Sequence, residues 1–162
     1  MKILVLSDSH GETEELENVI RSHSAAEVVI FCGDGNGDIE AMRYAFPEKM
    51  FISVRGNCDW CCNAPDKEEV TLCGKKIFIT HGHIYGVKQG LSRITAFGHS
   101  INADIVLFGH THQQIVTVDG SMILMNPGSL GFNAEYGIID IDDNGKITAE
   151  EYPPYSLGKV TL

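Results

Sequence analysis

The sequence lacks any run of the roughly 20 apolar residues that a membrane-spanning helix requires. Near the N-terminus, the apolar stretch from Ile3 to Leu6 is also too short for the apolar region of a secretory signal. We therefore expect a protein that makes no membrane contact and works in the cytoplasm.

Basic residues are scarce and scattered along the chain. There are 12 Lys and Arg against 22 Asp and Glu, which gives a formal net charge of −10. A long nucleic-acid footprint needs clustered basic side chains to neutralise phosphates, so an extended footprint of this kind is not expected. We expect a small partner molecule, or one whose charge is met by bound cations.

Cysteines are few, and their number, five, is odd. A domain of 162 residues can bury a sufficient core without disulfides, so we expect reduced thiols. Cys58 and Cys61 have the spacing of a zinc or redox pair, but no second pair completes a zinc site. The spacing therefore does not support a structural zinc ion.

Several catalytic and binding motifs are missing, or occur in a context that does not suit their function. The chain has no Gly-x-x-x-x-Gly-Lys-Ser/Thr loop, which excludes nucleotide binding of that kind. Ser7 and Ser9 flank Asp8, but neither lies in a Gly-x-Ser-x-Gly turn, so a serine nucleophile is unsupported. A calcium-loop pattern runs from Asp140 to Glu151, yet its flanks resemble strands rather than helices, and we predict a hairpin there.

What remains is the composition of one folded domain. Apolar residues make up 43% of the chain and charged residues 21%, as in ordinary globular proteins. A chain of 162 residues suits a single hydrophobic core. We expect residues 1–162 to form one domain.

The first part of the chain alternates strands with helices. Apolar runs predict strands at residues 2–7, 28–32 and 51–54, and helical spacing predicts helices at 14–22 and 39–45. Three strands separated by helices imply a parallel sheet with right-handed crossovers.

From residue 69 onward the pattern changes. We predict a hairpin from residues 70–72 and 77–80, a helix at about 87–101 and a strand at 104–108. Later strands are expected at 115–118, 122–125, 137–141 and 146–150. Because helices become rare after residue 101, we expect a second, mostly antiparallel sheet on the first. The predicted fold is α/β, with two packed β-sheets flanked by helices.

Metal-ligating residue types follow almost every predicted apolar strand. Because the carboxyl ends of parallel strands share one sheet edge, five loops should converge on one site. Carboxylate, imidazole and amide donors together favour Mn, Zn, Fe or similar ions over an all-oxygen Mg or Ca site. His23 and His99 lie away from strand ends and are interpreted as structural. The five motifs are Asp8-Ser9-His10, Gly33-Asp34, Gly56-Asn57-Cys58-Asp59, His81-Gly82-His83 and Gly109-His110-Thr111-His112.

These five motifs, in this order, closely resemble the calcineurin-like metallophosphoesterase superfamily over about residues 1 to 131. The short chain and the Asn-Cys-Asp variant are most similar to small bacterial and archaeal YfcE-type phosphodiesterases. The resemblance implies a four-layer α-β-β-α fold and hydrolysis of phosphate esters, diesters rather than monoesters. It also implies in-line attack by a hydroxide that bridges two divalent metal ions.

The resemblance further implies which residues bind the metals. Mn is favoured, and Ni, Zn, Fe and Mg are the other candidates. Asp34 would be the ligand shared by both ions. The ligands carried over by motif are Asp8, His10, Asp34 and His112 for metal one, and Asp34, Asn57, His81 and His110 for metal two.

Four residues are further candidates for catalysis: Asn57, Cys58, Asp59 and His83. Cys58 departs from the wider family, where many relatives carry a histidine that protonates the leaving group or holds the phosphate. A thiol can donate a proton but cannot place positive charge beside a phosphate, which puts the acid role in doubt. We expect His83 to contact phosphate or support a ligand, and Asp59 to orient its loop.

Two other functions remain open at this stage. One is a non-catalytic protein-binding scaffold, because a retromer subunit of the same fold resembles this family. The other is a phosphomonoesterase or nucleotidase acting through the same metals. All seven ligand positions are filled, which favours an enzyme with a small phosphate-ester substrate. The exposed edges of a two-sheet fold would also allow a homodimer.

Overall fold

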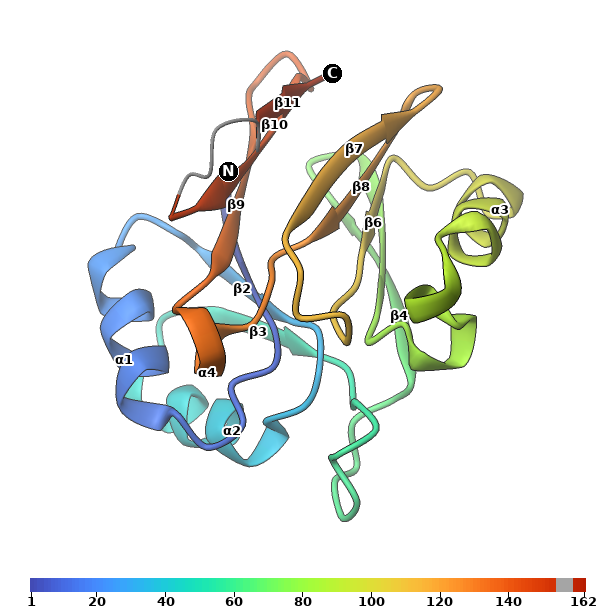
Figure 1. Cartoon of the computed structure of the whole chain (residues 1–162). Helices are drawn as coiled ribbons and strands as arrows, with labels where there is room; N and C mark the ends of the chain where they lie inside the picture. Colours follow the sequence, from blue (N-terminus) through green and yellow to red (C-terminus); the bar gives the residue numbers. More distant parts are fainter. Residues whose placement is uncertain (154–158) are drawn as a thin grey trace.

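The computed structural model describes residues 1–153 and 159–162. Within these residues, two β-sheets pack face to face, and helices cover the outer face of each sheet (Figure 1). This arrangement confirms the α/β fold with two packed sheets that the sequence predicts. The described residues contain no helix long and apolar enough to cross a membrane.

The first sheet contains the strands from both ends of the chain, in the order β11-β10-β9-β1-β2-β3. β1, β2 and β3 are parallel, as predicted, and α1 and α2 connect them. The bounds are β1 (Lys2–Leu6), α1 (Thr13–Ser22), β2 (Val28–Phe31), α2 (Asn36–Ala45), β3 (Met50–Ser53), β9 (Tyr136–Ile141), β10 (Ile147–Tyr152) and β11 (Lys159–Thr161).

The second sheet has the order β4-β5-β6-β8-β7 and is mixed, not mostly antiparallel as predicted. β6 is parallel to both β5 and β8, whereas the two outer pairs are antiparallel. β9 and β10 lie in the first sheet, because the buried residues of β9 continue the apolar face of β1. The bounds are β4 (Lys67–Leu72), β5 (Lys75–Thr80), β6 (Ile105–Leu107), β7 (Ile115–Asp119) and β8 (Met122–Asn126).

Three apolar clusters hold the layers together. The largest lies between the sheets and includes Val5, Ile30, Ile79 and Leu107, all fully buried. A second cluster packs α1, α2 and the short α4 (Leu130–Asn133) on the first sheet, and a third packs α3 (Ser92–Ser100) on the second. Because β1 and β2 are covered on both faces, their sequences are continuously apolar.

The predicted helix at 87–101 is broken into shorter pieces. Two short 3₁₀ helices, His83–Tyr85 and Val87–Gln89, precede α3, and each ends at a glycine with positive φ, Gly86 and Gly90. Such glycines end helices because they adopt this backbone without a Cβ clash. The calcium-loop pattern forms the predicted hairpin, in which Asp142 accepts hydrogen bonds from the backbone N–H groups of Asn144 and Lys146.

Candidate metal centre

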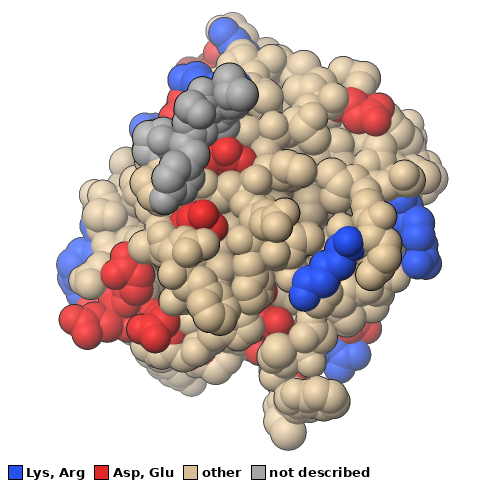
Figure 2. All heavy atoms as spheres, viewed as in Figure 1, with Lys and Arg blue, Asp and Glu red and all other residues tan. Residues whose placement is uncertain are grey.

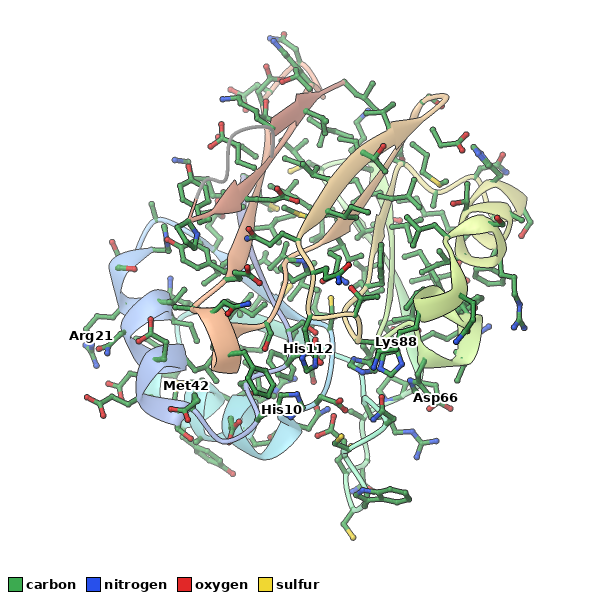
Figure 3. All side chains as sticks on the ribbon, viewed as in Figure 1. His10, Arg21, Met42, Asp66, Lys88 and His112 are labelled. Atoms are coloured by element: carbon green, nitrogen blue, oxygen red, sulfur yellow. The ribbon has the colours of Figure 1, made fainter. Side chains whose placement is uncertain are left out.

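The loops that follow β1, β2, β3, β5 and β6 meet at one edge of the two sheets. Figure 3 shows His10 and His112 at this edge, with Lys88 on the other side of the site in the same view. Three overlapping groups of side chains have their ligand atoms within 4.8 Å of one another. These groups are Asp8, His10 and His112; Asp8, Asp34 and His81; and His10, Asp34 and Cys58.

Asp8 has one carboxylate oxygen that is satisfied and one that is not. Its Oδ2 accepts hydrogen bonds from the Ser7 hydroxyl at 2.5 Å and the His110 backbone N–H at 3.1 Å. Its Oδ1 is buried and has no hydrogen-bond partner among the described residues. This oxygen lies 3.1 Å from His112 Nε2 and 3.8 Å from His10 Nε2. A buried anionic oxygen beside two imidazole nitrogens fits a cation.

His81 is fully buried and has a fixed tautomer. Its Nδ1 lies 2.8 Å from the carbonyl oxygen of Cys32, which can only accept, so Nδ1 carries the hydrogen. Nε2 lies 3.3 Å from Asp34 Oδ2 and 3.2 Å from Asn57 Oδ1, and it would present its lone pair to a metal ion that displaced its proton. A histidine oriented by a backbone carbonyl in this way is typical of metal sites.

Asp34 and His81 influence each other's protonation. Burial is the largest influence on the pKa of Asp34 and would raise it, but the hydrogen bond and charge of His81 and the Cys58 backbone N–H together hold that pKa well below its usual range. Burial is also the largest influence on the pKa of His81 and would lower it, but the hydrogen bond to Asp34 and the charges of Asp8 and Asp34 together raise it above the ordinary value. The carboxylate therefore stays ionised, and a cation bound here would take the place of the proton on His81 Nε2.

Three imidazole rings gather beside Asp34. The ring centroid of His81 lies 5.0 Å from that of His110 and 5.5 Å from that of His83. Burial, followed by the charges of His81 and Lys88, lowers the pKa of His110 to about 4. His110 is therefore neutral near pH 7, which is the form that binds metals. The Nδ1 of His83 is buried and has no hydrogen-bond partner among the described residues.

Cys58 lies at the edge of the cluster rather than inside it. Its backbone N–H donates to Asp34 Oδ1 at 2.7 Å, and its side chain is exposed. Burial and then Asp34 raise the pKa of the thiol, which keeps it protonated at neutral pH. All five cysteines are free thiols.

The carboxylate of Asp59 faces backbone N–H groups and not the predicted metal ligands. Its carboxylate accepts hydrogen bonds of 2.8 to 3.0 Å from the N–H groups of Asp34, Gly35, Asn36 and Gly56. The side-chain amide of Asn36 adds a fifth at 2.7 Å. Burial would raise the pKa of Asp59, but these hydrogen bonds lower it further than burial raises it. Asp59 thus ties the loop after β2 to the loop after β3.

Most of the predicted ligands have an unusual backbone. Left-handed φ values occur at Asp8 (54°), His10 (48°), Asp34 (59°), His110 (69°) and His112 (57°). Residues with side chains rarely adopt this region, and each such residue costs about 1 to 3 kcal/mol unless its surroundings hold it. Such strain gathers at functional sites, and five of the eight described non-glycine residues with positive φ are predicted ligands.

Several buried polar residues support the cluster, and sequence reasoning missed them. Asn126, at the end of β8, donates to the Gly109 carbonyl and to Thr111 Oγ1, both at 2.9 Å, and so holds the loop that carries His110 and His112. Burial was the missing information, because in the sequence these residues resemble ordinary turn formers. The missed residues are Ser7, Asn36, Asn126 and Ser129, all buried.

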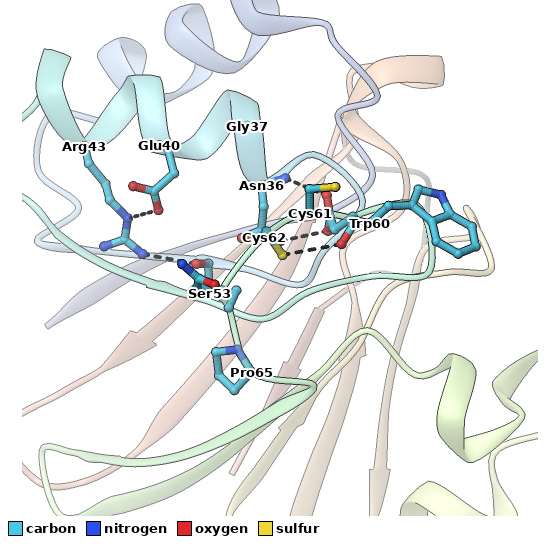
Figure 4. A pocket seen from close by; sticks show the side chains of 12 residues that line it. Asn36, Gly37, Glu40, Arg43, Ser53, Trp60, Cys61, Cys62 and Pro65 are labelled. Carbon is cyan, nitrogen blue, oxygen red and sulfur yellow. Dashed lines mark hydrogen bonds and ion pairs between the residues drawn. The ribbon is translucent and has the colours of Figure 1, made fainter.

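A separate groove of about 720 Å³ lies between α2 and the loop after β3 (Figure 4). It contains none of the seven predicted ligands, although Asn36 and Asp59 line its wall next to the cluster. The guanidinium of Arg43 in this groove is already bonded to Glu40, to the Phe51 carbonyl and to Ser53. The groove therefore adjoins the candidate centre without forming part of it.

A sequence profile of the calcineurin-like phosphoesterase superfamily domain matches residues 1–144. The chain belongs to this family. It is 35% identical over 131 residues to the probable metallophosphoesterase YsnB of Bacillus subtilis, covering 80% of this chain and 75% of the relative. It is 29% identical over 171 residues to phosphodiesterase YfcE of Escherichia coli, covering 88% and 89%. The match confirms two sequence-based predictions, the superfamily and the class of metal-dependent phosphoesterase.

The fold is also shared with a protein whose name refers to protein sorting and not to phosphoesterase activity. The structure of Vacuolar Protein Sorting 29 from Cryptosporidium parvum superposes with a TM-score of 0.78 at 16% identity, covering 99% of this chain and 95% of that one. At this identity the likeness concerns the fold alone. Function must therefore be argued from the residues at the sheet edge.

Proposed function

We propose that this chain hydrolyses phosphodiesters with two divalent metal ions bound at the sheet edge. Metal one would be held by Asp8, His10, Asp34 and His112, and metal two by Asp34, Asn57, His81 and His110. Two ions held by these residues would lower the pKa of a coordinated water and would stabilise the negative charge that develops in an in-line displacement. The observation that carries the proposal is the buried Oδ1 of Asp8, which has no hydrogen-bond partner within residues 1–153 and 159–162 and lies beside two imidazole nitrogens.

Asp34 is proposed as the shared ligand because it belongs to both halves of the cluster. It appears with Asp8 and His81 in one group of potential ligands and with His10 in another. Its backbone is fixed by the Asp59 carboxylate, and Gly56 leaves room for it, since a Cβ at Gly56 would lie 2.1 Å from Asp34 Oδ1. The chain thus holds this carboxylate in place between the two proposed sites.

The side of the site that carries His83 and His110 is proposed to bind the phosphate. Nδ1 of His83 has no hydrogen-bond partner in the part of the chain that the structure describes, and the charge of Lys88 acts on His110 beside it. On the face shown in Figure 2, basic side chains are scattered and do not form a stripe, in keeping with a small substrate. Asp59 is proposed as a positioning residue, since its oxygens are bonded to backbone N–H groups.

Residues 1–162 are proposed to act as one domain. The first sheet joins β1, β2 and β3 from the start of the chain to β9, β10 and β11 from its end. Neither part could be removed without exposing a buried strand. The cytoplasmic location and the homodimer stay predictions.

The direct test is hydrolysis by chelator-stripped protein refilled with Mn, Ni, Mg or Zn. We expect no turnover without metal, and metal-restored turnover of bis-p-nitrophenyl phosphate with little on p-nitrophenyl phosphate. The release of nitrophenolate from each substrate, measured together with the metal content of each sample, reports the metal dependence and the preference for the diester. We expect Mn to restore the most activity, because the proposed ligands include the carboxylate and amide oxygens that suit Mn.

Two outcomes would contradict parts of this proposal. Preferred turnover of the monoester would make the protein a phosphomonoesterase on the same metals. No turnover with any metal, despite two bound ions per chain, would favour a protein-binding scaffold of the same fold.

Replacing Cys58 by Ala tests whether the thiol donates a proton to the leaving group. The raised pKa keeps the thiol protonated, as an acid must be before reaction. We expect kcat to fall about tenfold or more for an alkyl leaving group and by less than about twofold for nitrophenolate, which needs no proton. Cys62→Ala, on the same loop, is the matched control. Equal losses on both substrates would argue against an acid role.

A further inference from the structure

Phe132 is an exposed aromatic side chain beside the candidate metal centre. The residue is 67% exposed, although phenylalanine is usually buried. It stacks on the ring of His112, with a centroid distance of 5.1 Å and an interplanar angle of 30°. It also meets His10 at 5.5 Å in an edge contact. Phe132 thus contacts two of the proposed ligands of metal one.

The backbone of Phe132 is fastened to the loop that carries Asp8. It lies in α4, whose first turn donates from Leu130 N–H to the Ser7 carbonyl and from Gly131 N–H to the Asp8 carbonyl, at 3.1 and 3.0 Å. Ser129 Oγ caps α4 through the Phe132 N–H. A Cβ at Gly131 would lie 2.4 Å from the Ser9 carbonyl oxygen, so only glycine permits this approach. The backbone that carries the ring is therefore held beside the Asp8 loop.

A purely structural role does not account for this exposure. A side chain that served only to pack against His112 would be expected to bury most of its ring. Phe132 instead contacts histidine rings on one side and leaves most of its surface to solvent next to the proposed reaction site. A fixed, exposed aromatic face is what proteins use to stack planar ligand groups, because every aromatic ring offers a π face.

We infer that Phe132 is a specificity-determining residue that stacks a planar aromatic group attached to the substrate phosphate. This inference rests on the proposed phosphodiesterase function and narrows its substrate class to esters that carry an aryl ring or a nucleobase. Small alkyl esters would bind through the phosphate alone.

The test measures binding of product-like anions to the metal-loaded protein by titration calorimetry. Two matched pairs are compared: phenylphosphonate with methylphosphonate, and thymidine 5′-monophosphate with deoxyribose 5-phosphate. Wild type should bind the aromatic member of at least one pair about tenfold more tightly, and Phe132→Ala should remove that preference. Affinity for the non-aromatic members should change by less than about twofold. The ligand pair for which Phe132→Ala no longer prefers the aromatic member shows whether the stacked group is an aryl ring or a nucleobase.

Three controls separate stacking from structural support. Phe132→Trp should keep the preference, since it keeps a π face, whereas Phe132→Leu should lose most of it. Tyr44→Ala removes an exposed aromatic residue on α2 and should have no effect. Metal content should be equal in all variants. Unchanged aromatic preference in Phe132→Ala would overturn the inference and leave the proposed function standing, whereas no binding of any anion by wild type would overturn both.

Discussion

Replacing Asp34 by Asn should remove bound metal and lower kcat for bis-p-nitrophenyl phosphate by about a thousandfold or more. The substitution keeps the shape of the side chain but removes the negative charge that the two proposed ions share. Asp34 is buried and its carboxylate stays ionised in the fold, and the carboxylate grouped with it, that of Asp8, is itself proposed as a ligand of metal one. Metal content by elemental analysis and steady-state kinetics test the two effects together.

The matched control is Asp143→Asn, which makes the same change at an exposed turn. It should leave metal content and kcat unaltered. Normal turnover by Asp34→Asn at normal metal content would rule out Asp34 as the shared ligand. Loss of turnover with both ions retained would assign Asp34 a role in the chemistry but not in metal binding.

Asp59→Ala should destabilise the protein by about 3 kcal/mol or more, because each buried donor left without a partner costs about 1 to 3 kcal/mol. Its carboxylate is the acceptor for four backbone N–H groups and the Asn36 amide. The loops carrying Asp34 and Asn57 would also lose their link, so metal affinity should fall as well. Urea unfolding of the metal-free protein isolates the stability effect.

Asp66→Ala provides the comparison for this prediction. Asp66 forms an ion pair with Arg55 in which both side chains are largely exposed, so its loss should cost less than about 1 kcal/mol. Asp59→Asn, which keeps one acceptor oxygen, should fall between the two. Similar unfolding curves for Asp59→Ala and Asp66→Ala would mean that the hydrogen bonds of Asp59 contribute little.

Short-range signals in the sequence predicted every described strand except β11. β1 and β2 are buried on both faces, which makes them continuous apolar runs. The ends of helices were less certain: α2 begins at Asn36, three residues before the predicted start, because Asn, Gly and Asp also form turns. α4 was missed, since its four residues carry no periodic pattern and its position depends on contacts with the Asp8 loop.

Local patterns in the sequence could not predict which strands pair when they lie far apart in the chain. Nothing local in β9 indicates that it pairs with β1 rather than with the second sheet. The same limit applies at the site, where strand-end motifs indicated the metal-binding residue types but not the groups that hold them. Asn126 is an example, because its contacts with Gly109 and Thr111 span more than a dozen residues of sequence.

The left-handed backbone at five predicted ligands also has a consequence for whether metal binding follows or precedes the shaping of the ligand loops. Protein groups already hold this backbone: the Asp8 carbonyl accepts from Ser129 and Gly131, and the His10 N–H donates to the Asp34 carbonyl. These hydrogen bonds hold the ligand loops through protein groups alone, so we expect the loops to keep their shape when metal is removed. The proposed centre would then exchange its ions without unfolding. Which metal it carries would in that case follow the supply of ions as much as the choice of ligands.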